Sequence, residues 1–183
     1  FSDPLVRAGQ PFLKKLANEN PITSVNVLAR LYGNNVMCVA DYKSPSFKKN
    51  TSYQRGKLMP LIYGATSRAI IMQITGKRLE NLINLENFKS DEDKNNFFKD
   101  LKNDRKKGYC FTKGQVDKGL IGFAASISNK KLGIEASLSS IFNLDDFLLE
   151  HEPIIYANLT TYALLVEKYI NEIFDEIQKY HHE

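Results

Sequence analysis

The stretch MPLIYGATSRAIIM, Met59 to Met72, interrupts an apolar segment with four small residues, Gly64 to Ser67. The part before them is typical of a strand or loop led by a proline, and the part after them has helical spacing. Small side chains at a helix start let another group approach the backbone, where unpaired N–H groups hold anions. That group is either a packed part of the fold or a ligand, and the stretch alone leaves both open.

A second group of small polar residues lies in EASLSSIF, residues 135–142. Ser137 and Ser139 are two positions apart, so on a strand they face the same side. If that face is turned toward the core, the two hydroxyls need hydrogen-bond partners. The alternative is a polar face turned toward solvent.

Helical and strand patterns alternate around these stretches, and hairpin signals dominate. Ser90 with Asp93 resembles a capping box, and Gly108 is suited to end the helix that Ser90 begins. Helices are expected over 3–20, 65–73, 77–85, 90–107 and 155–177, and strands over 25–31, 36–42, 109–114, 120–128 and 132–142. The pattern predicts an α+β fold on an antiparallel sheet.

The composition favours one globular domain, because 183 residues can bury a core and charged residues are 25% of the chain. No apolar run reaches the length of about eighteen residues that spans a bilayer. No signal peptide is recognisable at the start, so we expect a cytoplasmic protein without a membrane partner. The two cysteines and three histidines have no metal-ligand spacing, and we expect neither metal nor cofactor.

Three other functions compete with ligand binding. Lysine clusters and a net charge of +4 suggest nucleic-acid binding as one alternative, although solvated loops and a helix end also explain these lysines. Cys110 is imaginable as the nucleophile of a small enzyme acting on an organic acid, but no positioned base is visible for it. We interpret Cys110 as a core residue and expect no enzyme. The apolar stripes of the terminal helices also allow a purely structural oligomerisation module.

The order and spacing of several motifs resemble the effector-binding domain of the IclR family of bacterial transcriptional regulators. The resemblance covers nearly the whole chain. Its pattern runs from a helical linker through a small-residue helix start to an "R-x-x-G-Y" motif and paired serines. In this sequence these motifs are Pro11 to Leu16, Gly56 to Ala69, Arg105 to Tyr109, Gly119 to Ser126, and Ser137 to Ser139.

The resemblance implies a GAF-like fold, a curved antiparallel sheet flanked by helices. It also implies that the domain senses a small organic acid, aromatic acids included. Residues 1–20 would be a linker helix from a missing N-terminal winged helix-turn-helix domain, and residues 21–183 the effector-binding domain. DNA would be bound only through the missing domain. The resemblance also implies a homodimer or tetramer.

Carried over position by position, the resemblance also implies a ligand pocket. Its residues are Met59, Ala65, Thr66, Thr112, Leu120, Gly122, Ser137 and Ser139. The sequence departs from the family pattern at Gly64, Ser67, Arg68, Thr112 and Gln115. Thr112 and Gln115 stand where acidic residues are usual, and this loss of negative charge favours an anionic ligand.

Overall fold

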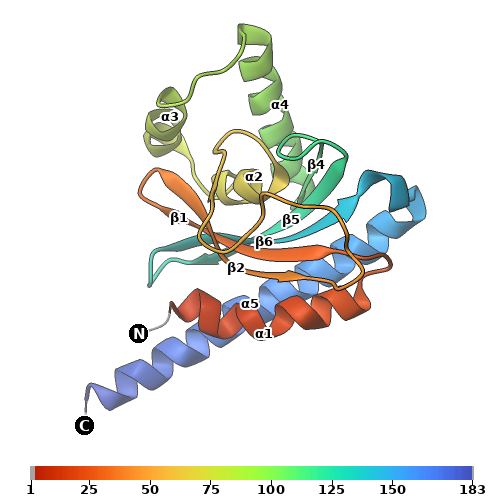
Figure 1. Ribbon diagram of the computed structural model, residues 1–183. Helices are drawn as coiled ribbons and strands as arrows, with labels where there is room; N and C mark the ends of the chain where they lie inside the picture. Colours follow the sequence, from red (N-terminus) through yellow and green to blue (C-terminus); the bar gives the residue numbers. More distant parts are fainter. Residues whose placement is uncertain (1–2, 183) are drawn as a thin grey trace.

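The computed structural model describes residues 3–182 and has an α+β fold built on one curved sheet (Figure 1). Six antiparallel strands follow the order β3-β2-β1-β6-β5-β4. The elements are α1 (Pro4–Glu19), β1 (Val25–Tyr32), β2 (Asn35–Lys43), β3 (Leu58–Met59), α2 (Ala65–Ile71), α3 (Gly76–Asn84), α4 (Asp91–Lys107), β4 (Cys110–Lys113), β5 (Leu120–Asn129), β6 (Ile134–Asn143), the 3-10 turns η1 (Leu144–Asp146) and η2 (Leu149–His151), and α5 (Glu152–Tyr180). The expected fold class is confirmed.

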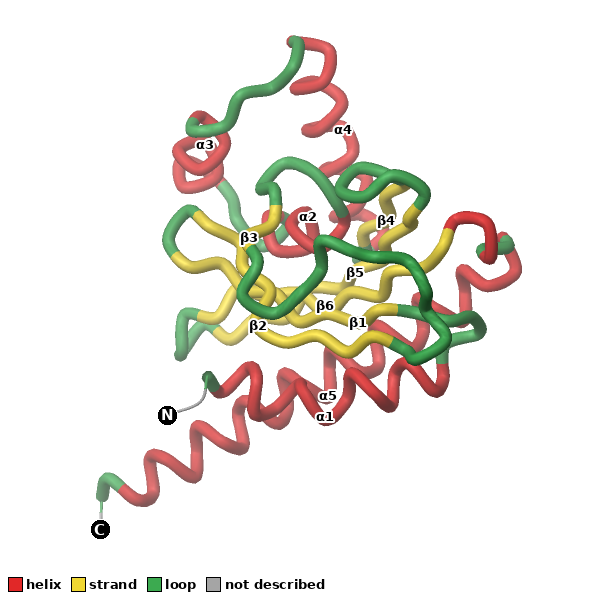
Figure 2. Tube along the Cα trace, in the orientation of Figure 1, coloured by secondary structure: helices red, strands yellow, loops and turns green. Residues whose placement is uncertain are grey.

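The sheet separates two layers of helices, as Figure 2 shows. Helices α1 and α5 cover one face, and α2 lies on the other together with the long loops. The face under α1 and α5 is apolar, with Leu16, Leu138 and Leu159 among its buried side chains. The face under α2 combines an apolar cluster with buried hydroxyl groups.

Strand β6 places the paired serines in the middle of the sheet, because β1 and β5 flank it. Ser137 lies opposite Ala29 of β1 and Ser126 of β5. Side chains alternate along a strand, so Ser137 and Ser139 share the face that α2 covers. The predicted common face is confirmed, and it is buried rather than turned to solvent.

Most expected element ends agree with the structure within two or three residues. The hydroxyl of Ser90 accepts a hydrogen bond from the Asp93 amide at 3.1 Å, and Gly108 ends α4 with φ +82°. Helix α2 ends two residues early, because the amides of Gln73 and Ile74 bond three residues back in a tighter turn. Both 3-10 turns have no periodic signal and were not expected, and β3 includes only the first residue, Met59, of the stretch expected to be a strand or loop.

Candidate functional site

Helix α2 begins at Gly64, whose backbone no other residue adopts without strain. Its φ is +90°, and a β-carbon built there would lie 2.5 Å from Cγ2 of Val116. The chain therefore comes close to the loop between β4 and β5 at this point. The small-residue stretch thus serves close packing at its first position.

The first two amides at this end of α2 are bonded by side chains of the β4 region. The Gly64 amide donates to Oε1 of Gln115 at 2.9 Å, and the Ala65 amide donates to Oγ1 of Thr112 at 3.0 Å. A helix start leaves such donors without backbone partners. Neutral oxygens supplied by Gln115 and Thr112 occupy the place that a carboxylate was expected to take.

Hydroxyl groups of the central strands bond the other side of α2. Oγ of Ser137 donates to the Thr66 carbonyl at 2.8 Å, and Oγ of Ser139 lies 2.8 Å from Oγ1 of Thr66. On β5, Oγ of Ser126 donates to the Ala69 carbonyl at 2.6 Å. We call Ser126, Ser137 and Ser139 the serine seam. The seam fixes α2 to the sheet through polar contacts.

Six of the eight expected pocket residues come together at this end of α2. They are Ala65, Thr66, Thr112, Gly122, Ser137 and Ser139. A β-carbon built on Gly122 would lie 3.6 Å from Cβ of Ala65 and 3.7 Å from Oγ1 of Thr112. Met59 and Leu120 belong to the adjoining apolar cluster. All eight are buried, and Met59, beside the apolar cluster, is only 6% exposed. The expected residues are packed against one another, and Thr112 also lines a hollow of about 330 Å³.

A loop-to-loop contact lies beside these residues. In the β2–β3 loop, the amide and hydroxyl of Ser52 donate to the two carboxylate oxygens of Asp117 at 2.9 and 2.6 Å. The neighbouring Tyr53 is buried, and its hydroxyl lies 3.7 Å from a β-carbon built on Gly64. Two loops distant in the sequence therefore close over the start of α2.

A buried ion pair anchors the same end of α2 from outside. Nε of Arg68 bonds the Asp104 carboxylate, and its Nη2 donates to the Phe111 carbonyl at 3.0 Å. Burial raises the pKa of Asp104 more than the guanidinium lowers it. Hollows of about 420 and 330 Å³ flank the pair, and both are lined by Arg68 and the exposed Gln115.

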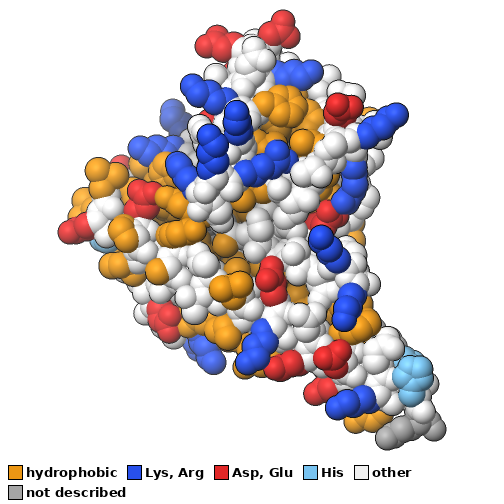
Figure 3. All heavy atoms as spheres, turned by 180° about the vertical axis from the view of Figure 1, so that it is seen from behind, with side chains coloured by type: hydrophobic (Ala, Val, Ile, Leu, Met, Phe, Trp, Pro, Cys, Tyr) orange, Lys and Arg blue, Asp and Glu red, His pale blue; other side chains and the backbone are white. Residues whose placement is uncertain are grey.

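The competing functions find little support. Cys110 is fully buried beside Met72, and burial raises its pKa well above the usual range, which suits a core thiol and not a nucleophile. Among residues 3–182, no cluster of side chains is able to hold a metal ion, and no helix is apolar enough to cross a membrane. On the face in Figure 3, basic side chains gather in the upper part, and basic and acidic side chains are interspersed over the rest. Arg105 is used internally, bonding the carbonyls of Met72 and Ile74.

The structure also assigns partners that the sequence had not suggested. Gln115 and Arg68 stood out only as departures from a family pattern, yet they bond the start of α2 and a buried carboxylate. Their partners lie 51 and 36 residues away in the chain. The only sequence signal for Arg68 and Gln115 was that each differs from the residue usual at that position in the family pattern.

Known structures share this fold. The chain resembles a putative IclR transcriptional regulator from Silicibacter sp. TM1040 with a TM-score of 0.81 at 12% identity, over 91% of this chain and 66% of that one. The C-terminal domain of the E. coli regulator KdgR matches with a TM-score of 0.76 at 17% identity, over 92% of this chain and 99% of that one. An IclR homolog from Microbacterium hydrocarbonoxydans, complexed with 4-hydroxybenzoate, matches with a TM-score of 0.77 at 16% identity, over 92% of this chain and 68% of that one.

No curated protein matches the chain in sequence. The family model described as "Bacterial transcriptional regulator IclR C-terminal" matches residues 2–165, which is most of the chain. That match includes α1, the sheet, the expected site and the first half of α5. The chain belongs to the IclR family of bacterial transcriptional regulators and carries its C-terminal domain.

Proposed function

We propose that this domain senses a small carboxylic acid bound at the start of α2 and passes that state to a DNA-binding domain through α1. The observation that carries the proposal is the gathering of donors there. The amides of Gly64 and Ala65 and the hydroxyls of Thr66 and Ser139 lie around one helix start. A carboxylate accepts several hydrogen bonds at once and suits such a set.

Binding in this proposal is an exchange of acceptors. The carboxylate takes the amides that Gln115 and Thr112 now hold, and Gln115 is the one that solvent reaches. Arg68, one turn further along α2, is paired with Asp104 and its Nη1 lies 3.8 Å from Oδ2 of Asp100, so its charge is already balanced on the side of the two hollows. The preference for a carboxylate rests on the N–H and O–H donors gathered at the helix start, because a carboxylate accepts several hydrogen bonds and needs no acceptor in return.

Strand β6 connects the proposed site to α1. Ser139 contacts Thr66 on one face, while the next residue, Ser140, donates to Oδ1 of Asn26 at 2.7 Å on the other. Asn20, the residue that ends α1, donates to the same oxygen at 3.3 Å. A shift of β6 on ligand binding would thus reach the end of α1. Such coupling requires that the ligand bind two conformations with different affinity.

The proposal implies binding without turnover. Residues 1–20 act in it as the connection to a winged helix-turn-helix domain, and residues 21–183 as the sensor. DNA is contacted through that other domain, so the protein works in the cytoplasm, and the domain itself assembles as a homodimer or tetramer. This chain alone should show no sequence preference for DNA and only salt-sensitive binding.

A binding screen tests the proposal. We expect at least one member of an aliphatic and aromatic carboxylate panel, with 4-hydroxybenzoate as one aromatic member, to raise the melting temperature. The double variant Ser137→Ala with Ser139→Ala should then weaken binding of that compound by about 1.5–3 kcal/mol, which is the contribution of hydrogen bonds to a charged group.

Ser126→Ala is the matched control, because it removes the same kind of bond to α2 at another position of the serine seam. It should reduce stability by about 1 kcal/mol and leave affinity unchanged. Equal affinity in the double variant would exclude the two serines from the site. Consumption of the compound would favour an enzyme.

A further inference from the structure

Large hydrophobic side chains are exposed at one end of the sheet, where β6 leads through η1 and η2 into α5. Leu149 is 81% exposed, Leu148 54% and Ile154 49%, and Pro153 beside them is exposed as well. Figure 3 shows this end at its left edge, as a group of hydrophobic side chains with acidic ones among them. We call Leu148, Leu149, Pro153 and Ile154 the apolar tip.

The apolar tip is held outward by the fold beneath it. The ring of Phe147, directly before the tip, packs against that of Phe123 with centroids 5.6 Å apart. The Leu148 amide donates to Nδ1 of His151 at 3.0 Å, and Ile155 at the start of α5 is fully buried. Exposed apolar side chains that a fold holds in contact with water favour a partner that covers them.

Negative charge surrounds the tip within η1 and η2. Asp145, Asp146 and Glu150 are exposed, and none of them forms an ion pair within residues 3–182. Glu152 differs, because its carboxylate accepts a hydrogen bond from the hydroxyl of Tyr109 at 2.7 Å. Three uncompensated carboxylates beside exposed leucines favour a partner surface that carries lysine or arginine.

Positive charge borders the tip on the side of β4 and the end of α4. The ammonium group of Lys107 lies 5.9 Å from the ring centroid of Tyr109, and that of Lys113 lies 5.9 Å from the ring centroid of Phe111, which packs near Phe147. Both lysines are exposed, line the hollow of about 330 Å³, and form no ion pair within residues 3–182. Figure 3 shows basic side chains directly above the hydrophobic group.

A surface with both signs of charge around an apolar centre is suited to a second copy of itself. A two-fold axis places the same patch on both subunits, so the acidic border of each meets the basic border of the other. Asp145, Asp146 and Glu150 would repel a nucleic acid or an anionic membrane. The start of α1, where a DNA-binding domain would attach, lies at the other end of the molecule (Figure 1).

We infer that the apolar tip joins two copies of this chain across a two-fold axis. Leu149 lies at the centre of the contact, and Lys107 and Lys113 of each copy face the acidic border of the other. A standard interface buries about 800 Å² on each partner, so the charged borders belong to the contact together with the tip. The inference deepens the assembly stated in the proposed function and rests on it, but it requires no ligand.

Sedimentation of the whole chain over a concentration series tests the centre of the contact. Leu149→Asp should weaken dimerisation about tenfold or more, because it adds a charge to the apolar centre. Leu85→Asp is the matched control, since Leu85 is 62% exposed at the end of α3, and it should leave dimerisation unchanged. An assembly that Leu149→Asp leaves intact would refute this interface and keep the proposed assembly, whereas a chain that stays monomeric would refute both.

Charge reversal tests the pairing across the two-fold axis. One variant combines Lys107→Glu with Lys113→Glu, and the other combines Asp146→Lys with Glu150→Lys. Each alone should dimerise about tenfold more weakly or worse, because like charges then face each other. An equimolar mixture should regain the association, since every reversed border meets one of opposite charge in the mixed dimer. If the mixture associates as weakly as each variant alone, while melting curves show both folded, the inference is wrong.

Discussion

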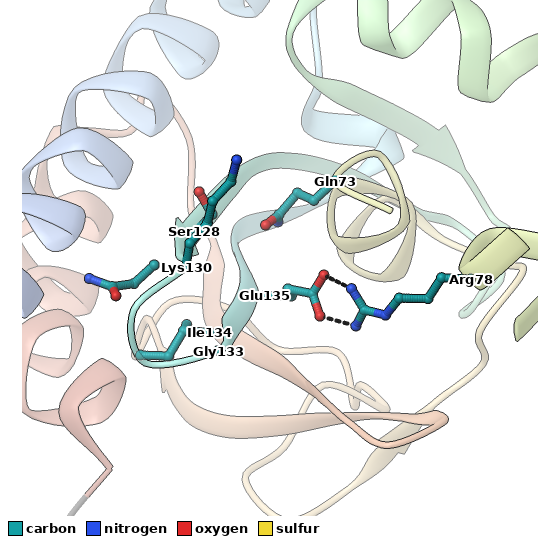
Figure 4. A pocket seen from close by; sticks show the side chains of 8 residues that line it. Gln73, Arg78, Ser128, Lys130, Gly133, Ile134 and Glu135 are labelled. Atoms are coloured by element: carbon teal, nitrogen blue, oxygen red, sulfur yellow. Dashed lines mark hydrogen bonds and ion pairs between the residues drawn. The ribbon is translucent and has the colours of Figure 1, made fainter. Parts of the chain in front are cut away.

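The two ends of α2 differ in how their polar groups are satisfied. At the start, Gln115 and Thr112 bond the amides, and the expected ligand residues are buried against one another, with Thr112 also lining the hollow of about 330 Å³. At the far end, Oε1 of Gln73 is buried without a donor among residues 3–182, and a hollow of about 650 Å³ lies beside that residue (Figure 4). A short helix fixed by the serine seam thus has one closed and one open end. Binding at the closed end must therefore displace the side-chain oxygens of Gln115 and Thr112 from the amides they now accept from.

The largest difference between the ends should appear when their ion pairs are broken. Arg68→Met leaves the buried carboxylate of Asp104 without its partner, which should lower the free energy of unfolding by about 3–5 kcal/mol. Arg78→Met at the open end should lower it by less than about 1 kcal/mol, because the Arg78 side chain, which pairs with Glu135, is 60% exposed. Urea unfolding of both variants measures the contrast.

The loss in Arg68→Met should also depend on pH. Burial already raises the pKa of Asp104 in the folded state, and without Arg68 it should rise further. A raised folded-state pKa means that the folded protein binds the proton more tightly than the unfolded chain does, so acidification favours folding. The deficit relative to wild type should therefore shrink from neutral to mildly acidic pH. A deficit that grows on acidification would contradict the buried pair.

The next contrast concerns the two glycines that flank α2. Gly64→Ala meets both a left-handed backbone and Val116 at 2.5 Å, so we expect a loss of about 2–4 kcal/mol. Gly76→Ala, also at positive φ but with open space around it, should lose only about 1–2 kcal/mol. Thermal unfolding of the pair separates backbone strain from close packing. Equal losses would mean that the loop with Val116 gives way easily.

The smallest effect should come from Gln115→Ala. It frees the Gly64 amide from its side-chain acceptor, so a carboxylate no longer has to displace that oxygen. Affinity for the active carboxylate should rise by about 0.5–1.5 kcal/mol, or up to about tenfold. Gln178→Ala, another exposed glutamine, on α5 and on the opposite face of the sheet, is the control. Weaker binding in Gln115→Ala would mean that Gln115 contacts the ligand itself.

The sequence predicted what depends on short-range patterns. The two-residue spacing of Ser137 and Ser139 was sufficient to place them on one face, and Ser90 and Gly108 were sufficient to bound α4. Contacts between distant segments were not predictable in this way. That Gln115 reaches the Gly64 amide depends on how a loop folds back over a helix, and local periodicity carries no such information.

The open end shows the same limit. Gln73 belongs to a stretch with helical spacing, and its sequence neighbours do not reveal that its amide reaches the carbonyl of Ala136. The charge of Lys130 was interpreted as a solvated turn, which its exposure agrees with. Only the approach of the β5–β6 turn to the end of α2 brings these residues around one hollow (Figure 4).

The most direct test of the central claim is to map where the most tightly bound carboxylate of the screen contacts the domain. Amide NMR shifts of wild-type protein with that compound report both ends of α2 in a single titration. We predict that the largest shifts fall on Gly64, Ala65, Thr66 and the strand around Ser139, with smaller ones at the end of α1. Shifts confined to Gln73 and residues 128–135, with the start of α2 unmoved, would contradict the account.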